Sequence, residues 1–166
     1  MEIDKTYIID GRYCNYINNF KQVEKDITKL LTGDSIYENY LDEFIDVSML
    51  SEVKKGNVFY SVSSCCEEIV CVASFVCLEN GENEYELEQI VTKEGFRDKG
   101  IAKLTMIKAI NYIRNISLNS KIYATVFLED KVLYNLLKSL GFVQIQSLGV
   151  DVEFLMPDQI NLMLTI

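Results

Sequence analysis

Histidine is absent from this chain of 166 residues. Its absence excludes a nucleophile activated by histidine and removes the commonest zinc ligand. Acid and base catalysis therefore falls to Glu, Asp, Tyr, Lys or water. Long apolar runs are also missing: no stretch approaches the ~20 residues of a membrane span, and the N-terminus does not resemble a signal peptide. We expect a cytoplasmic protein that does not enter the membrane.

Basic residues are in short supply, with 16 Lys and Arg against 25 Asp and Glu and a formal net charge of −9. Proteins that bind nucleic acid gain much of their affinity by neutralising phosphates, so this balance argues against a nucleic-acid partner. An acidic chain is compatible with a cationic substrate such as an amine, although acidity more often serves solubility.

The cysteines are odd in number and have no spacing typical of metal sites. They are Cys14, Cys65, Cys66, Cys71 and Cys77. Most lie in strand-like segments, where a thiol behaves as a small hydrophobe in a reducing compartment. We therefore expect buried thiols and no metal.

Length and hydrophobic periodicity indicate a single domain over residues 1–166. The expected helices are Tyr13–Leu31, Ser35–Val53, Ile101–Ile116 and Asp130–Leu140. The expected strands are Thr6–Asp10, Asn57–Ser63, Ile69–Leu78, Tyr85–Thr92, Ile122–Leu128, Phe142–Leu148 and Ile160–Ile166, and Val152–Met156 is also β-prone. This order predicts an α/β fold with a mixed, mostly antiparallel central sheet of about seven strands flanked by about four helices.

The segment RDKGIA, residues 97–102, joins an expected strand to an expected helix. A glycine at position 100 lets the backbone approach a ligand, and a loop running into a helix start aims N–H groups and the positive dipole end at an anion. Arg97, Lys99 and Lys103 would be mildly unfavourable there without an anion. We predict a phosphate-binding loop, but one that lacks the Gly-Lys-Ser/Thr ending found in P-loop nucleoside triphosphatases.

Residues Leu87–Leu104, LEQIVTKEGFRDKGIAKL, resemble the acyl-CoA-binding signature of the GNAT superfamily of N-acetyltransferases. The family pattern is Arg or Gln, two residues, Gly, one residue, and Gly or Ala, which is met here by Arg97, Gly100 and Ala102. The segment LLKSLGF, residues 136–142, is similar to the family helix that ends in a Gly-Phe pair. Order and spacing extend the resemblance over nearly the whole chain.

The resemblance implies acetyl-CoA as cosubstrate, with no metal. Its pyrophosphate would be bound by the loop, whose residues are Arg97, Asp98, Lys99, Gly100, Ile101, Ala102 and Lys103. Its pantetheine arm would pair like an added strand with the backbone of Ile90, Val91 and Thr92.

The resemblance also suggests a catalytic base. Glu88, nine residues before Arg97, matches a position where family members often carry glutamate. Glu84, Glu86 and Glu88 alternate along one strand, so mutual repulsion could raise one pKa while the cluster holds an amine. The alternative interpretation is that these carboxylates line a solvated face.

At the position of the catalytic acid, which would protonate the departing thiolate, the chain departs from the family pattern. The usual tyrosine lies four residues before the glycine of the Gly-Phe pair, and here that residue is Leu137. Tyr134, one helical turn earlier, is the nearest replacement. Asp130 replaces a frequent asparagine and would serve as a helix N-cap. The group that would protonate the departing thiolate is therefore not fixed: it is Tyr134, a water molecule, or absent.

Two functions are consistent with these residues. The first is an N-acetyltransferase in which a primary amine, either a small cationic molecule or a protein amino group, attacks acetyl-CoA directly. The second is a non-catalytic acyl-CoA-binding or protein-interaction module. The resemblance implies that the acceptor groove is formed by the two helices before the sheet together with the hairpin near the C-terminus. A homodimer is compatible with Ile160–Ile166 if that long apolar strand lies at a sheet edge.

Overall fold

The structure is a computed structural model that describes residues 3–11, 20–32, 52–53, 55–78, 83–145 and 158–166. The strands are β1 (Lys5–Ile9), β2 (Val58–Cys65), β3 (Glu68–Cys77), β4 (Glu84–Thr92), β5 (Lys121–Phe127), β6 (Val143–Ile145) and β7 (Gln159–Thr165). The helices are α1 (Phe20–Thr32), the short 3-10 helix η2 (Glu94–Phe96), α4 (Ile101–Ile116) and α5 (Lys131–Ser139).

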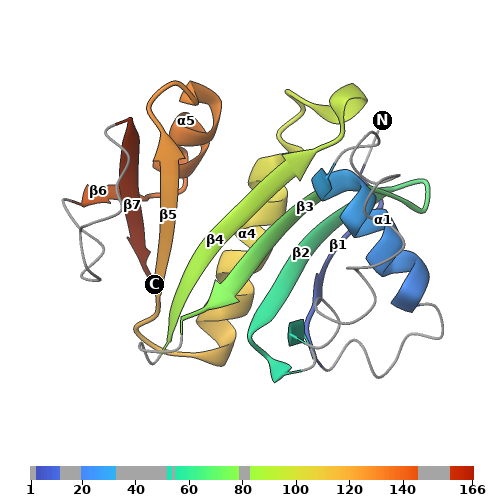
Figure 1. The fold of residues 1–166 in the computed structure, drawn as a ribbon, viewed down its shortest axis with the longest axis horizontal. Coiled ribbons are helices and arrows are strands. Elements are labelled where there is room, and N and C mark those ends of the chain that lie inside the picture. The colour runs from blue at the N-terminus through green and yellow to red at the C-terminus, as the bar shows by residue number, and fades with distance from the viewer. Residues whose placement is uncertain (1–2, 12–19, 33–51, 54, 79–82, 146–157) are drawn as a thin grey trace.

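The strands form one seven-stranded sheet in the order β1-β2-β3-β4-β5-β7-β6 (Figure 1). Every neighbouring pair is antiparallel except β4 and β5, which are parallel. Helix α4 makes the crossover that a parallel pair requires. The fold class predicted from the sequence is confirmed.

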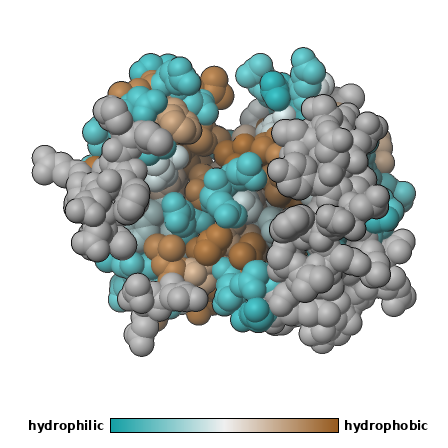
Figure 2. All heavy atoms as spheres, in the orientation of Figure 1, coloured by the Kyte–Doolittle hydropathy of each residue, from teal (hydrophilic) through white to brown (hydrophobic). Residues whose placement is uncertain are grey.

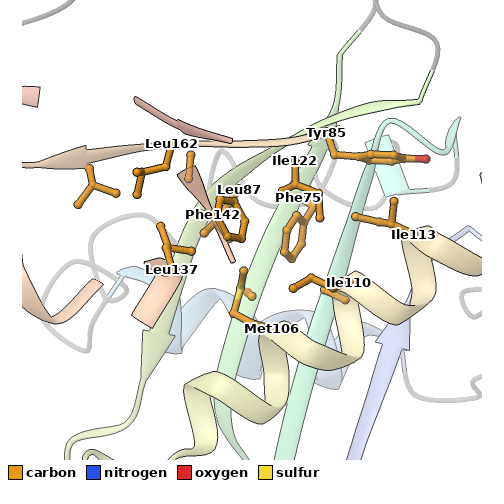
Figure 3. Packing of buried hydrophobic residues seen from close by; sticks show 14 of the residues in the cluster. Phe75, Tyr85, Leu87, Met106, Ile110, Ile113, Ile122, Leu137, Phe142 and Leu162 are labelled. Carbon is orange, nitrogen blue, oxygen red and sulfur yellow. The ribbon is translucent and has the colours of Figure 1, made fainter. Parts of the chain in front are cut away.

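Helices cover both faces of the sheet (Figure 1). Helix α1 packs on one face with a cluster that includes Ile27, Tyr60 and Val72. Helix α4 covers the other face, where Met106 and Ile113 point into the largest cluster (Figure 3). Successive side chains of a strand point to opposite faces of the sheet, so alternate residues of each strand pack into the two clusters.

Several expected elements lie partly or wholly outside the described residues. Three α-helices are described, whereas about four were expected; of the helix expected over 35–53, only the last two residues fall in the described part. The first helix is described from Phe20 onward, and the strand expected over 142–148 is seen as β6. The β-prone segment 152–156 is not described.

The expected edge position of the C-terminal strand is wrong. Strand β7 pairs with β5 on one side and with β6 on the other, so β6 is the edge. Hydrophobic alternation reports which face of a strand is buried but not its order in the sheet. The ground for dimerisation through Ile160–Ile166 is therefore removed. In the part of the chain that the structure describes, no helix is long and apolar enough to cross a membrane.

Candidate active site

Strands β4 and β5 start as neighbours and then separate (Figure 1). Their parallel pairing runs from Glu84 opposite Lys121 to Leu87 opposite Ala124 and stops there, although both strands continue. Figure 2, in the same view, shows a groove at the surface between the region of α5 and the loop after β4. Hydrophobic residues lie on the floor of this groove. The second half of β4 thus has no strand on its β5 side among the described residues.

A β-bulge lies where the two strands part. Phe75 of β3 is opposite Leu87, but the preceding residue Ser74 is opposite Gln89, so Glu88 is the extra residue of β4. Bulges redirect side chains and are frequent beside active sites. The extra residue allows both Leu87 and Ile90 to pack into the cluster under α4, and it places Glu88 at the apex of the opening.

The main chain beyond the bulge presents polar groups to the opening. The N–H of Lys93 donates to the C=O of Val70 at 2.9 Å, which directs residue 93 toward β3. Backbone polar groups of successive strand residues point to alternate sides. Val91 therefore also faces β3, whereas Ile90 and Thr92 face the open side. Of the three residues expected to pair with a pantetheine arm, these two have the required orientation.

The loop after β4 has a backbone geometry that favours an anion. Gly100 is exposed, has φ of 75°, and is the N-cap of α4 without a side-chain cap. The N–H of Leu104 donates to the C=O of Gly100 at 3.1 Å. Because the N–H groups ahead of that bond have no partner within a helix, the amides of Ile101, Ala102 and Lys103 are presented at the positive dipole end.

Charged side chains of the loop fold back on main-chain carbonyl groups at the end of β4 and in the loop. The Nε of Arg97 donates to the C=O of Thr92 at 3.1 Å, and the Nζ of Lys99 donates to the C=O of Gly95 at 2.7 Å. Both side chains and that of Lys103 are exposed. The first turn of α4 contains no acidic residue, so no carboxylate of that turn competes with a bound phosphate.

A buried hydroxyl network holds the start of α4 on the sheet. Thr105 is fully buried; its Oγ1 donates to the C=O of Ile101 at 2.9 Å and lies 2.8 Å from the Oγ of Ser63. The Oγ of Ser61 donates to the C=O of Thr105 at 2.7 Å. The sequence analysis missed these residues, although serine at alternate positions of a buried strand is the signal that could have found them.

The three carboxylates of β4 do not form one cluster. Glu84 accepts from Lys121 Nζ at 2.9 Å and from Tyr123 Oη at 3.1 Å. The Lys121 hydrogen bond is the largest cause that lowers the pKa of Glu84. Burial is the largest cause that raises the pKa of Glu86, and the charge of Glu88 adds to it. The raised pKa expected from mutual repulsion is therefore found at Glu86, with burial as its main cause.

Glu88 is exposed, and its Oε2 lies 3.4 Å from the Oγ of the buried Ser74. Tyr60 lies on the same face, and its pKa is raised. Burial is the largest cause, and the charges of Glu88 and Glu24 add to it. Tyr60 was not predicted as a site residue, because its position in a strand gives no sign of the carboxylates beside it. Glu88 is thus a solvent-accessible carboxylate supported by a buried hydroxyl.

The pKa of Glu86 leads to a pH-dependent prediction. A carboxyl whose pKa is raised on folding binds more protons in the native state, so stability falls as the pH rises from about 4.5 through the raised pKa. We expect Glu86→Gln to unfold at higher urea concentration than wild type at neutral pH, with the difference vanishing below about pH 4.5. Glu84→Gln is the matched control and should be less stable than wild type at neutral pH, since the pKa of Glu84 is lowered. Equal urea midpoints for Glu86→Gln and wild type at neutral pH would contradict this account.

The expected acid region lies in α5. Asp130 caps this helix by accepting the N–H of Leu133 at 2.9 Å, which confirms the predicted N-cap. Leu137 is fully buried and packs with Phe142 in the cluster under α4 (Figure 3). Tyr134 is half-buried at the border of the same cluster. The position of the family tyrosine is therefore part of the core in this chain, and a leucine there serves packing.

Restoring that tyrosine should damage the fold without improving catalysis. We expect Leu137→Tyr to lower the free energy of unfolding by about 1–3 kcal/mol, because the larger side chain overpacks the core and buries a hydroxyl. Urea unfolding measures the loss, and Tyr134→Phe, which keeps the ring, is the control with near-wild-type stability. A Leu137→Tyr protein of unchanged stability and faster turnover would show that the position opens to the site.

A cavity of about 520 Å³ lies between α1 and the end of β4. Its lining includes Val91 and Thr92 together with three acidic and three basic residues. They are Asp26, Glu68, Glu94, Lys29, Lys93 and Arg97. The charges balance, so this cavity has no net preference for a polycation.

The comparisons with known proteins agree with this geometry. The sequence model of the acetyltransferase (GNAT) family matches residues 25–142. The fold is similar to the PaiA N-acetyltransferase of Thermoplasma acidophilum solved in complex with coenzyme A, at 11% identity and a TM-score of 0.63, covering 98% of this chain and 99% of that one. It is also similar to Escherichia coli ElaA, at 12% identity and a TM-score of 0.66, covering 96% and 97%.

A third similar structure is a GNAT-family acetyltransferase of Staphylococcus aureus, at 17% identity and a TM-score of 0.64, covering 97% of this chain and 99% of that one. Among curated protein sequences, none matches the chain. The family match spans more than half of the chain and includes β4, the loop and α4. The chain therefore belongs to the GNAT acetyltransferase family.

Proposed function

We propose that this protein transfers an acetyl group from acetyl-CoA to a primary amine by direct attack of the amine on the thioester. The observation that carries the proposal is the open half of β4, followed after a short loop by the start of α4, which has no side-chain cap. An open strand edge can pair with the amides of a pantetheine arm, and a helix start can bind a diphosphate. Family membership supports acyl transfer as the type of chemistry.

The residues present fit the cosubstrate. The amides of residues 97–103 would hold the pyrophosphate, and Arg97, Lys99 and Lys103 would add positive charge. An alanine Cβ built on Gly100 meets no atom within 4 Å, so the loop leaves space where a phosphate would lie. Bound acetyl-CoA supplies the activated acetyl group as a thioester.

Glu88 would accept the ammonium proton of the acceptor, directly or through a water molecule, because it stands at the apex of the opening and is accessible to solvent. Main-chain N–H groups on the open side of β4 would polarise the thioester carbonyl. Tyr134 or water would protonate the departing thiolate. Holding amine and thioester together at this apex would supply much of the rate enhancement.

The acceptor would approach on the α1 face, where Glu86 and Glu88 interact. These carboxylates favour a cationic amine, whereas the balanced charge of the neighbouring cavity does not favour a polycation. The proposal therefore covers both a small amine and a protein amino group. A cytoplasmic location stays a prediction.

The test is to incubate the full chain with acetyl-CoA and a panel of diamines, lysine peptides and peptides with a free N-terminus. Release of free thiol shows the deacylation of acetyl-CoA, and mass spectrometry identifies the acetylated amine. We expect at least one amine to be acetylated in a protein-dependent manner. Coenzyme A binding without acetylation of any amine in the panel would contradict the proposal.

A second candidate is a module that binds acyl-CoA without turnover. The buried Leu137 favours it, because this side chain cannot donate a proton. The same incubation separates the two candidates: a module would bind acetyl-CoA with no thiol release beyond that of buffer.

A further inference from the structure

Three side chains with metal-binding atoms meet at the turn between β2 and β3. Cys65 ends β2, Cys66 follows in the turn, and Asp4 directly precedes β1. One carboxylate oxygen of Asp4 and the two Sγ atoms all lie within 4.8 Å of one another. No cysteine spacing in the sequence indicated this group, since Asp4 is brought to the thiols only by the pairing of β1 with β2.

The separation of the two sulfur atoms matches a metal chelate. They lie 3.9 Å apart. A tetrahedral ion that holds two thiolates at about 2.3 Å each separates them by roughly 3.8 Å. The two thiols can therefore bind one such ion with little movement, and a carboxylate oxygen of the exposed Asp4 already lies within 4.8 Å of both sulfur atoms.

The backbone of the turn is unusual for its residues. Cys66 and Glu67 have φ of 52° and 65° and connect the paired residues Cys65 and Glu68. A two-residue hairpin loop of this type favours Asn-Gly, because other side chains strain a positive φ. The turn is held by the Asp4 carboxylate, which accepts the N–H of Cys66. Asp4 is held in turn by its own N–H, which donates to the C=O of Ser64 at 3.0 Å.

The group combines one shielded and two accessible ligands. Cys65 is 4% exposed, while Asp4 and Cys66 are exposed. Two thiolates and a carboxylate form a soft donor set that suits Zn²⁺ and its heavier analogue Cd²⁺ better than Mg²⁺ or Ca²⁺. Three protein ligands leave a fourth tetrahedral position to water.

We propose that Asp4, Cys65 and Cys66 form a binding site for a thiolate-seeking divalent metal ion, of which Zn²⁺ is the biological example. The site does not depend on the proposed acetyl transfer, because none of its three residues lies in β4, the phosphate loop or the cavity. A bound ion would tie the start of β1 to the β2–β3 turn. It would also support the small cluster in which Cys65 packs with Ile101 and Phe96, beneath the phosphate loop.

The experiment is a titration of the purified full chain with Cd²⁺ after reduction with a phosphine and removal of metals. We expect ultraviolet charge-transfer absorption from thiolate to cadmium that saturates at one ion per chain. Cys66→Ser should abolish the saturating band, and Asp4→Asn should weaken the affinity by on the order of 10-fold or more. Cys77→Ser is the matched control: this cysteine lies in β3, away from the group, and its loss should leave the titration unchanged.

A second readout guards against misfolded variants. Far-ultraviolet circular dichroism must match wild type, and saturating Zn²⁺ should raise the unfolding temperature of wild type and Cys77→Ser but not of Cys66→Ser, because an ion that binds only the native state stabilises it. Absence of the charge-transfer band in wild type, or a band that Cys66→Ser leaves unchanged, overturns the proposal.

Discussion

Glu88→Gln lowers the turnover number by on the order of 10²–10⁴ while the affinity for coenzyme A stays unchanged, because general base catalysis typically contributes that much and the substitution leaves the loop intact. Glutamine has nearly the shape of glutamate but cannot accept the ammonium proton. Its amide can still occupy the place beside the Oγ of Ser74, which lies 3.4 Å from the Oε2 of Glu88. Initial rates of thiol release, measured with the acceptor found in the panel, test the expectation.

Glu86→Gln is the discriminating control for this experiment. Glu86 lies two residues earlier in β4 and interacts with Glu88, but it pairs opposite Val76 before the strands part. We expect its substitution to reduce turnover much less. If Glu86→Gln were the more damaging of the two, the base would be Glu86 and the role proposed for the bulge would be wrong.

Gly100→Ala raises the dissociation constant for coenzyme A by on the order of 10–100-fold, because the added methyl group displaces a phosphate from the loop amides and forfeits a charge-assisted hydrogen bond worth roughly 1.5–3 kcal/mol. In the absence of ligand this methyl group meets no atom within 4 Å. The stability loss is therefore limited to the strain of φ 75° in a residue with a side chain, about 1 kcal/mol.

Gly56→Ala is matched for strain. Gly56 has φ of 83°, meets no atom within 4 Å on addition of a Cβ, and lies in the turn before β2 rather than in the loop before α4. Both variants should lose similar stability in urea, but only Gly100→Ala should lose affinity in calorimetry. Equal affinities for the two variants would show that no phosphate lies against Gly100.

The sequence was sufficient for the fold class and for the order of strand, loop and helix around Gly100. The periodicity of Ile101–Ile116 and the alternation of the strands report local burial, so element types and the fold class could be predicted. Arg97, Gly100 and Ala102 lie within six consecutive residues, and the order of strand, loop and helix around them needs no long-range information. The N-cap at Asp130 is likewise a local feature.

Features that depend on sheet order or on distant partners could not be predicted. The inner position of β7 follows from its pairing with both β5 and β6. The separate role of Glu84 follows from Lys121, which lies 37 residues away. The bulge at Glu88 arises because β3 and β4 differ in register on its two sides. Leu137 illustrates the same limit, since a family position associated with chemistry lies here in the core.

Isothermal titration calorimetry of the wild-type chain with coenzyme A tests the central claim most directly. The claim is that the amides at the start of α4 and the open half of β4 bind this molecule together. We predict saturable binding of one coenzyme A per chain. Pantetheine, which lacks the diphosphate, should bind more weakly, because the loop then has no diphosphate to bind. An absence of binding heat at several temperatures, or equal affinity for pantetheine and coenzyme A, would contradict the account.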